Sequence, residues 1–196
     1  MTISYRYGRN IYLNMTNRCP NSCTFCVRNC MDSLGDADSL WLDKEPTVEE
    51  TMESLDRYVP GSYDEVVFCG YGEPTERFDD IVKVANLIHE RLGKKVRLNT
   101  NGLGNLINGR DIIPEMKGVF DSVSISLNAP DAGTYMSLCS PEFGDGSYDS
   151  LISFIEGCRD TVGDVTVSVV SGTISQAQED ECERIASRLG VRYRCR

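Results

Sequence analysis

Short strand-like segments alternate with segments of helical periodicity along almost the whole chain. The strand-like segments are residues 11–15, 65–69, 95–99, 122–127, 165–170 and 191–195. Apolar residues recur at helical spacing between them, as at Val48, Met52 and Leu55. A helix that connects two strands of one sheet almost always makes a right-handed crossover between parallel strands. The chain is therefore expected to form a parallel sheet covered by helices.

Six strand–helix units are two fewer than the eight of a closed TIM barrel. The expected fold is α/β, a partial, laterally open (β/α)6 TIM-type barrel of parallel strands with outer helices. The chain has 196 residues, of which 40% are hydrophobic. This size suits one sizeable core and is short for two. We expect residues 1–196 to form a single domain, with no separate substrate or auxiliary-cluster domain.

Local signals mark several helix starts. Thr47 with Glu50, and Ser175 with Gln178, have the spacing of capping boxes. Further helices are expected from about Asp79, from about residue 147 and, as a short stretch, from Asp111. His89 lies within one of these patterns and is expected at the surface.

Charge and cysteine content narrow the class of protein. The net charge is −10, which disfavours a broad non-specific surface for nucleic acid or anionic membrane. No apolar run approaches the ~18 residues of a membrane span, and the start of the chain does not resemble a signal peptide, so a cytoplasmic protein is expected. Four of the nine cysteines fall between Cys19 and Cys30. In a reducing compartment such clustering indicates metal rather than disulfides.

The cysteine-rich segment directly follows the first predicted strand. Cys19, Cys23 and Cys26 have the spacing C-x3-C-x2-C, with Phe25 before the third cysteine. A structural zinc site needs four ligands, and Cys30 is close enough in sequence to supply the fourth. Three cysteines can instead hold a four-iron cluster and leave one iron open to an exogenous ligand. The spacing alone leaves both readings open.

Glycine and polar residues follow several of the other strands. The turn from Gly70 to Pro74 reads G-Y-G-E-P, and Asn99 precedes T-N-G. Ser126 and Asn128 are two residues apart, so strand alternation would place them on one face. Each pattern is common when it occurs alone. Together they lie at the carboxyl ends of parallel strands, where such folds place their sites.

The order of these motifs resembles the radical S-adenosylmethionine (SAM) superfamily, whose signature is C-x3-C-x-aromatic-C after the first strand. The resemblance covers nearly the whole chain. It implies a [4Fe-4S] cluster held by Cys19, Cys23 and Cys26, with Cys30 outside the ligand set. It also implies SAM contacts by the following residues: Phe25, Gly70, Gly72, Glu73, Asn99, Ser126, Asn128 and Val170.

The resemblance assigns a role to each group of contacts. The turn ending in Gly72 and Glu73 would bind the methionine amino group, although Tyr71 separates the two glycines and departs from the family's G-G-E pattern. Asn99 would lie near SAM. Ser126 and Asn128 would reach the ribose hydroxyls or the carboxylate, and Val170 would form part of the wall under the adenine.

The implied chemistry is reductive cleavage of SAM to methionine and a 5′-deoxyadenosyl radical, which abstracts a hydrogen atom from a substrate. No further catalytic residue is implied. A one-electron donor of the flavodoxin or ferredoxin type is the implied partner. The longer segments around these motifs resemble the small TatD-linked radical SAM proteins, which implies a possible association with a TatD-type nuclease. An open-sided barrel suits a macromolecular substrate, either protein or nucleic acid.

Two other functions of the protein stay open, and so do the roles of several individual residues. One is an activase that installs a glycyl radical on a partner enzyme; the other is a non-catalytic iron–sulfur electron-transfer or structural metal module. Arg18 and Arg28 flank the cysteine segment and would offset cluster charge, bind an anionic substrate or simply lie exposed. Cys30 is read as a spare thiol. The polar segment 32–45 is expected to be an extended loop, in which Trp41 would form a lid, a partner contact or a local anchor.

Overall fold

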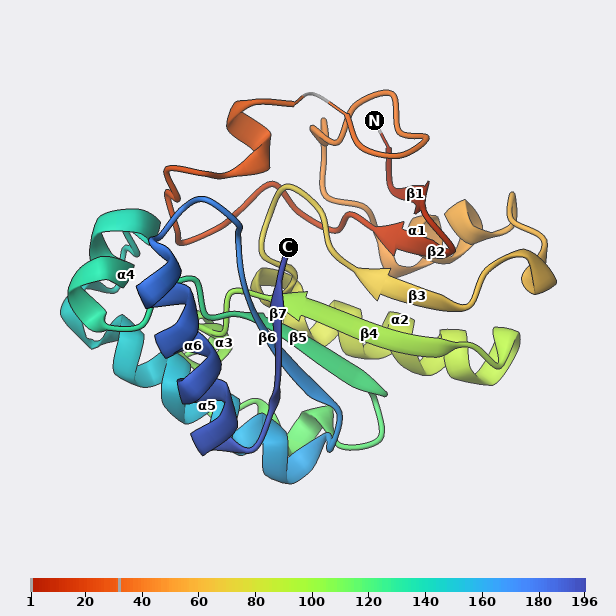
Figure 1. The fold of residues 1–196 in the computed structure, drawn as a ribbon. Helices are drawn as coiled ribbons and strands as arrows, with labels where there is room; N and C mark the ends of the chain where they lie inside the picture. The colour runs from red at the N-terminus through yellow and green to blue at the C-terminus, as the bar shows by residue number, and fades with distance from the viewer. Residues whose placement is uncertain (1, 32) are drawn as a thin grey trace.

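The structure is a computed structural model that describes residues 2–31 and 33–196. Met1 and Asp32, the first residue of the predicted loop 32–45, lie outside the described residues. A seven-stranded sheet forms its centre, with the strands side by side in sequence order (Figure 1). They are β1 (Ser4–Tyr7), β2 (Asn10–Leu13), β3 (Glu65–Phe68), β4 (Lys95–Thr100), β5 (Ser122–Ser126), β6 (Val165–Val169) and β7 (Arg192–Cys195).

Strands β2 to β7 are each parallel to the next, and their positions confirm the six predicted strands. The sheet ends at β1 and β7 without closing, as expected for a partial barrel. β1 was not predicted. It pairs antiparallel with β2 across a two-residue connection in which Gly8 has φ 60°. A four-residue strand before a tight hairpin gives too short an alternation to distinguish from a loop.

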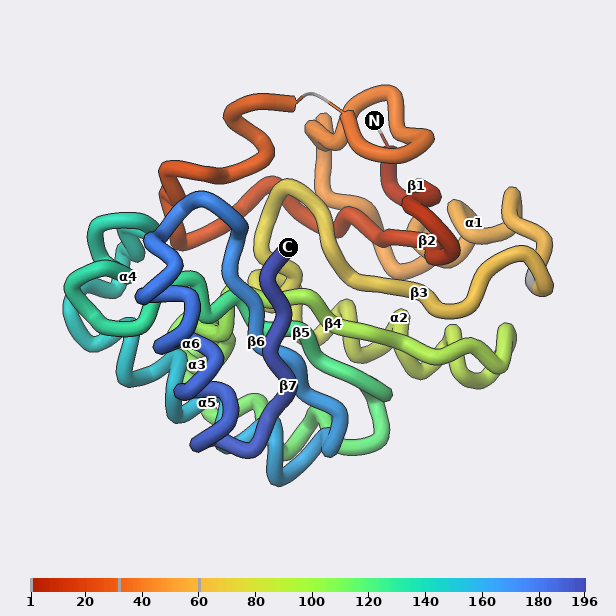
Figure 2. The backbone as a smooth tube through the Cα atoms, viewed as in Figure 1, coloured from red at the N-terminus to blue at the C-terminus, as the bar shows by residue number. Residues whose placement is uncertain are grey.

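Helices surround the curved sheet (Figures 1 and 2). They are α1 (Val48–Leu55), α2 (Phe78–Leu92), α3 (Gly104–Asn108), α4 (Ala132–Cys139), α5 (Ser147–Thr161) and α6 (Gln176–Leu189). Short 3-10 segments are η1 (Val27–Asn29), η2 (Pro60–Ser62), η3 (Pro74–Arg77), η4 (Ile113–Met116) and η5 (Gly144–Gly146).

Both predicted capping boxes are present, at Thr47 and at Ser175. The stretch expected from Asp111 is the single 3-10 segment η4. The prediction omitted α3 and α4. Asp131 caps α4 by accepting a hydrogen bond from the Thr134 amide, which is a signal that the sequence contains. His89 is only partly exposed, because its Nε2 lies 3.0 Å from the Val119 carbonyl oxygen.

The two faces of the sheet differ in character. On β4, Val96 and Leu98 are fully buried, whereas Arg97 and Asn99, which alternate with them, are partly exposed. β5 repeats this pattern, with Val123 and Ile125 buried. Side chains alternate across a strand, so the apolar set packs under the helices and the polar set lines the inside of the barrel. The candidate site is therefore expected among the polar side chains on the inside of the barrel.

Candidate functional site

The three-cysteine loop rests on the end of α4, a helix that lies far from it in sequence. The amides of Ser22 and Thr24 donate to the carbonyl oxygens of Cys139 and Leu138, each at 2.9 Å, and the Glu142 amide donates to the carbonyl oxygen of Pro20 at 2.9 Å. The last carbonyls of a helix have no partner within that helix. The loop satisfies them and gains a rigid support, visible where the red loop meets α4 (Figure 2).

Cys19, Cys23 and Cys26 are all free thiols and partly buried on this loop. Within residues 2–31 and 33–196, no three histidine, cysteine or acidic side chains converge as they would around a single metal ion. Burial raises the pKa of Cys19 to about 12. Metal binding requires thiolates and therefore releases these protons. Three soft sulfur donors on one partly exposed loop fit an iron–sulfur cluster better than a hard cation.

The thiol that lies next to Cys23 of the loop is Cys139, and not Cys30. Cys139, buried at the end of α4, is in hydrogen-bond contact with Cys23, and this contact raises the pKa of Cys23. Cys139 also accepts from Asn128 Nδ2 at 3.5 Å. Cys30 is exposed, and its sulfur contacts the Cys26 carbonyl oxygen at 3.8 Å. Sequence reasoning missed Cys139, because only the packing of α4 against the loop brings the two segments together.

The glycines of the turn after β3 permit a close backbone approach. A Cβ on Gly70 would lie 2.0 Å from Asn14 Oδ1, and one on Gly72 would lie 2.3 Å from the Thr16 carbonyl oxygen. Real Cβ atoms do not approach other atoms so closely. The turn therefore packs directly against the chain that leads from β2 into the cysteine loop. Glycine is needed here for that packing, a reason separate from any cofactor contact.

Glu73 is the buried centre of this turn, only 4% exposed. Its carboxylate accepts from Thr100 Oγ1 at 2.7 Å, from the Asn101 amide at 2.7 Å and from Thr75 Oγ1 at 2.8 Å. The Glu73 amide donates to the Arg18 carbonyl oxygen at 2.8 Å. Burial raises the pKa of Glu73 despite these donors. Glu73 therefore ties the end of β4 to the base of the cysteine loop.

Several polar atoms at the strand ends are buried without a hydrogen-bond partner among the described residues. They are Asn99 Oδ1, Asn128 Oδ1, Asn101 Nδ2 and Ser168 Oγ. Buried polar groups normally form hydrogen bonds. A set of buried polar atoms without partners at one edge of the sheet therefore indicates that a polar ligand or water forms hydrogen bonds with them. Hydroxyl and amino groups of a nucleoside-type ligand could donate to the amide oxygens. The residues present thus fit a polar cofactor beside the cysteine loop.

The strand alternation expected from Ser126 to Asn128 is not present in the structure. β5 ends at Ser126, and Asn128 has the left-handed φ of 61°, so its side chain turns toward Cys139. Ser126 Oγ instead accepts from Arg196 Nη2 at 3.1 Å. Val170 follows β6, and its carbonyl oxygen accepts from Thr173 Oγ1 at 2.7 Å. Phe25, partly buried, packs against the main core.

The charged residues beside the loop have partners. Arg18 pairs with Glu45 at 2.8 Å and with Glu76 at 3.1 Å. Arg28 donates to the carbonyl oxygens of Asn17 and Asn21, each at 3.5 Å. The positive charge of Arg18 is therefore offset by carboxylates of this chain, which favours a structural role over binding of an anion.

Segment 33–45 packs over the β1–β2 hairpin and the turn after β3. Leu40 is fully buried in a small cluster with Tyr5, Ala37 and Tyr71. Trp41 is 43% exposed, and its ring lies edge-on to Tyr71 with centroids 5.1 Å apart. Of the roles considered for Trp41, this contact favours a local anchor.

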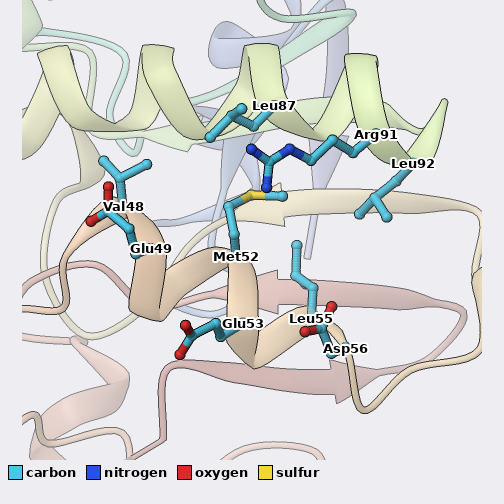
Figure 3. Close-up of a pocket in the computed structure, with 9 residues that line it drawn as sticks. All are labelled: Val48, Glu49, Met52, Glu53, Leu55, Asp56, Leu87, Arg91 and Leu92. Carbon is cyan, nitrogen blue, oxygen red and sulfur yellow. The ribbon is translucent and has the colours of Figure 1, made fainter.

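A hollow of about 330 Å³ lies between α1 and α2 (Figure 3). Met52 and Leu55 of α1 face Leu87, Arg91 and Leu92 of α2 across it. It contains no cysteine and no strand-end residue. It therefore lies outside the candidate site.

Fold and site together define an α/β protein of the TIM-barrel type, in which a three-cysteine loop lies at the carboxyl edge of an open parallel sheet. The chain belongs to the radical SAM superfamily, whose family model matches residues 13–187. No helix of the described residues is long and apolar enough to cross a membrane.

Individual relatives are distant. A probable dual-specificity RNA methyltransferase RlmN from Lachnospira eligens is 21% identical over 134 residues, covering 66% of this chain and 35% of that protein. A radical SAM methyltransferase from Sphaerobacter thermophilus superposes with a TM-score of 0.68 and 19% identity, covering 98% of this chain and 57% of that one. Streptococcus suis SuiB bound to S-adenosylmethionine superposes with a TM-score of 0.69 and 18% identity, covering 96% of this chain and 40% of that one. The chain thus spans about a third to somewhat over half of these proteins, and the structural likeness shows the fold.

Proposed function

We propose that this protein is a radical SAM enzyme that reductively cleaves SAM at a [4Fe-4S] cluster to generate a 5′-deoxyadenosyl radical for hydrogen abstraction. The observation that carries the proposal is the position of the three free thiols beside buried, unpartnered polar atoms at one edge of the sheet. Cys19, Cys23 and Cys26 would hold the cluster. When bound, cluster and SAM supply the one-electron chemistry.

The chain's own residues would orient the cofactor and exclude water. The turn of Gly70, Gly72 and Glu73 would present its backbone to the amino group. Asn99, Asn128 and Ser126 offer polar atoms at neighbouring strand ends, while Phe25 and Val170 offer apolar surface. Glu73 itself acts mainly as a positioning residue in this proposal, because four donors of the chain already occupy its carboxylate.

Anaerobic reconstitution followed by incubation with dithionite and SAM tests the proposal. We expect 5′-deoxyadenosine in the wild type, and loss of both cluster absorbance and product in Cys23→Ala. Cys30→Ala is the matched control, because Cys30 is an exposed thiol on the same loop. An intact cluster that yields no 5′-deoxyadenosine would refute the enzymatic function. Retained four-iron absorbance in Cys23→Ala would refute the ligand assignment.

The finer assignments rest on sequence resemblance. Kinship with TatD-linked radical SAM proteins, association with a TatD-type nuclease, a flavodoxin- or ferredoxin-like electron donor and a single core domain over residues 1–196 stay proposals, as does a cytoplasmic location. A macromolecular substrate is supported by the open side of the sheet and by the names of two similar proteins, an RNA methyltransferase and SuiB bound to its precursor peptide. No specific observation favours the glycyl-radical activase or the non-catalytic iron–sulfur module.

A further inference from the structure

The inner face of the sheet carries a column of arginines on β7. Strand register places Arg192 in one row with Ser124 and Thr166, and Arg194 in the next row with Ser126 and Ser168. Arg97 of β4 lies in the row beside Ser122. These strands border a hollow of about 520 Å³, lined among others by Arg97, Ser124, Thr166, Arg192 and Arg194.

Only part of this positive charge is neutralised. Two carboxylates line the hollow, and each already has an arginine: Glu65 pairs with Arg97 at 2.9 Å, and Asp164 pairs with Arg192. Arg194 forms no ion pair or hydrogen bond through its guanidinium within the described parts of the chain. Among the residues that the structure describes, the Arg196 guanidinium donates only to Ser126 Oγ, at 3.1 Å. Arg194 thus brings one unpaired guanidinium to the edge of the hollow, and Arg196 brings a second beside Ser126, in a protein whose net charge is −10.

Buried polar atoms on the central strands point to a ligand. Arg97 Nε on β4 and Ser168 Oγ on β6 are buried and have no partner among the described residues, and Ser168 is only 1% exposed. Charged residues on an edge strand such as β7 often serve to prevent pairing with another sheet. That role explains Arg192 and Arg194. It does not explain buried donors without a hydrogen-bond partner on β4 and β6, because each of these strands is already paired on both sides. Ser168 lies in the same row as Arg194, so an anion bound by Arg194 would also accept a hydrogen bond from Ser168 Oγ.

We propose that the inner face of the sheet binds a phosphate monoester carried by the substrate, with Arg194 as its main charged contact. A phosphate monoester has a charge of about −1.5 to −2 at neutral pH and three strongly accepting oxygens. This matches two unpaired guanidinium groups and the neighbouring hydroxyls, whereas a carboxylate would leave one arginine unmatched. A long polyanion is disfavoured by the overall acidity.

The phosphate site rests on the proposed function in one respect: the bound phosphate is taken to belong to the substrate of the radical SAM enzyme. Arg194 shares its row with Ser126, one of the expected SAM contacts at the strand ends. Residues two apart on a strand are separated by roughly 7 Å, so the row of Arg192 lies about that far toward the amino edge. A phosphate held between these rows would leave the carboxyl edge to the cofactor and direct the rest of the substrate toward it.

Isothermal titration of the anaerobically reconstituted protein tests the site, with phenyl phosphate, inorganic phosphate and acetate as probes at fixed ionic strength. We expect phenyl phosphate to bind the wild type and Arg194→Gln to weaken binding at least about tenfold, the loss typical of one charge-assisted contact. Arg91→Gln is the matched control, because Arg91 is an exposed arginine on α2. Thermal melting and cluster absorbance check that both variants fold.

Each remaining outcome decides the proposal. Equal weakening in Arg91→Gln, or none in Arg194→Gln, would overturn it in favour of general surface charge or edge protection. Acetate binding as tightly as phenyl phosphate would overturn the phosphate assignment, and a tenfold preference for inorganic phosphate would overturn the ester. Wild-type 5′-deoxyadenosine formation is measured in the same preparation. Its absence alongside Arg194-dependent phosphate binding would refute the radical SAM proposal and leave the anion site standing.

Discussion

Replacement of Gly72 by alanine tests the packing on which the site depends. The added Cβ would lie 2.3 Å from the Thr16 carbonyl oxygen and 2.6 Å from that of Arg18, both backbone atoms that cannot rotate away. Overpacking of this kind costs ~1–3 kcal/mol. The shift would also weaken the 2.8 Å hydrogen bond from the Glu73 amide to Arg18, worth ~1 kcal/mol. We expect a total destabilisation of about 3 kcal/mol, or a fall in Tm of ~6–12 °C for a domain of this size.

The assay is thermal unfolding followed by circular dichroism, with Gly61→Ala as the matched control. Gly61 has open space around its Cβ position and no left-handed backbone, so the control is expected to change the free energy of unfolding by less than ~0.5 kcal/mol. Gly72→Ala should also reduce the iron content after reconstitution, because Arg18 directly precedes Cys19. A Gly72→Ala melt that coincides with the control would refute the close approach described for the turn.

Two further predictions concern Glu73 and the end of α4. Because burial raises the pKa of Glu73 in the folded state, the folded chain binds that proton more tightly than the unfolded chain, and this contribution to stability declines as pH rises above 4.5. Wild-type Tm relative to Glu73→Gln should therefore be higher at about pH 5 than at about pH 8; a gap that widens with pH would contradict this sign. Ser140 has φ 41°, so Ser140→Gly should relieve strain and raise Tm by ~2–4 °C. Ser187→Gly, inside α6, should lower Tm, and equal shifts in the two variants would refute the argument from strain.

The sequence was most informative where local patterns decide the structure. Parallel strands β2 to β7 and the capping boxes at Thr47 and Ser175 depend on short-range alternation and side-chain reach, and all were predicted. The hairpin strand β1 and the short helix α4 were not predicted. β1 owes its place to pairing with β2, and α4 to packing against α5 and the cysteine loop.

The residues of the candidate site likewise fall into those that local sequence patterns predict and those that only the folded structure reveals. The cysteines, Glu73 and the polar strand ends can be found from sequence, because each follows a recognisable strand. Cys139 and Arg194 cannot, because their relevance arises from register and from contact between distant segments. Gly70 and Gly72 were predicted for cofactor contact, and the structure adds a reason that no local pattern contains, namely the approach of Asn14 and Thr16.

These contacts give the cysteine loop two supports from opposite parts of the chain. The turn after β3 holds its start through the hydrogen bond between Glu73 and Arg18, and the end of α4 holds its middle through Ser22 and Thr24. Glu73 in turn is fixed by Thr100 and Asn101 at the end of β4, so the position of Cys19 depends on β3 and β4 together. A loop of three cysteines has little structure of its own to set the spacing of its sulfurs. The spacing is therefore a property of the assembled sheet, and disturbance of either support should reach the cysteines before it unfolds the barrel.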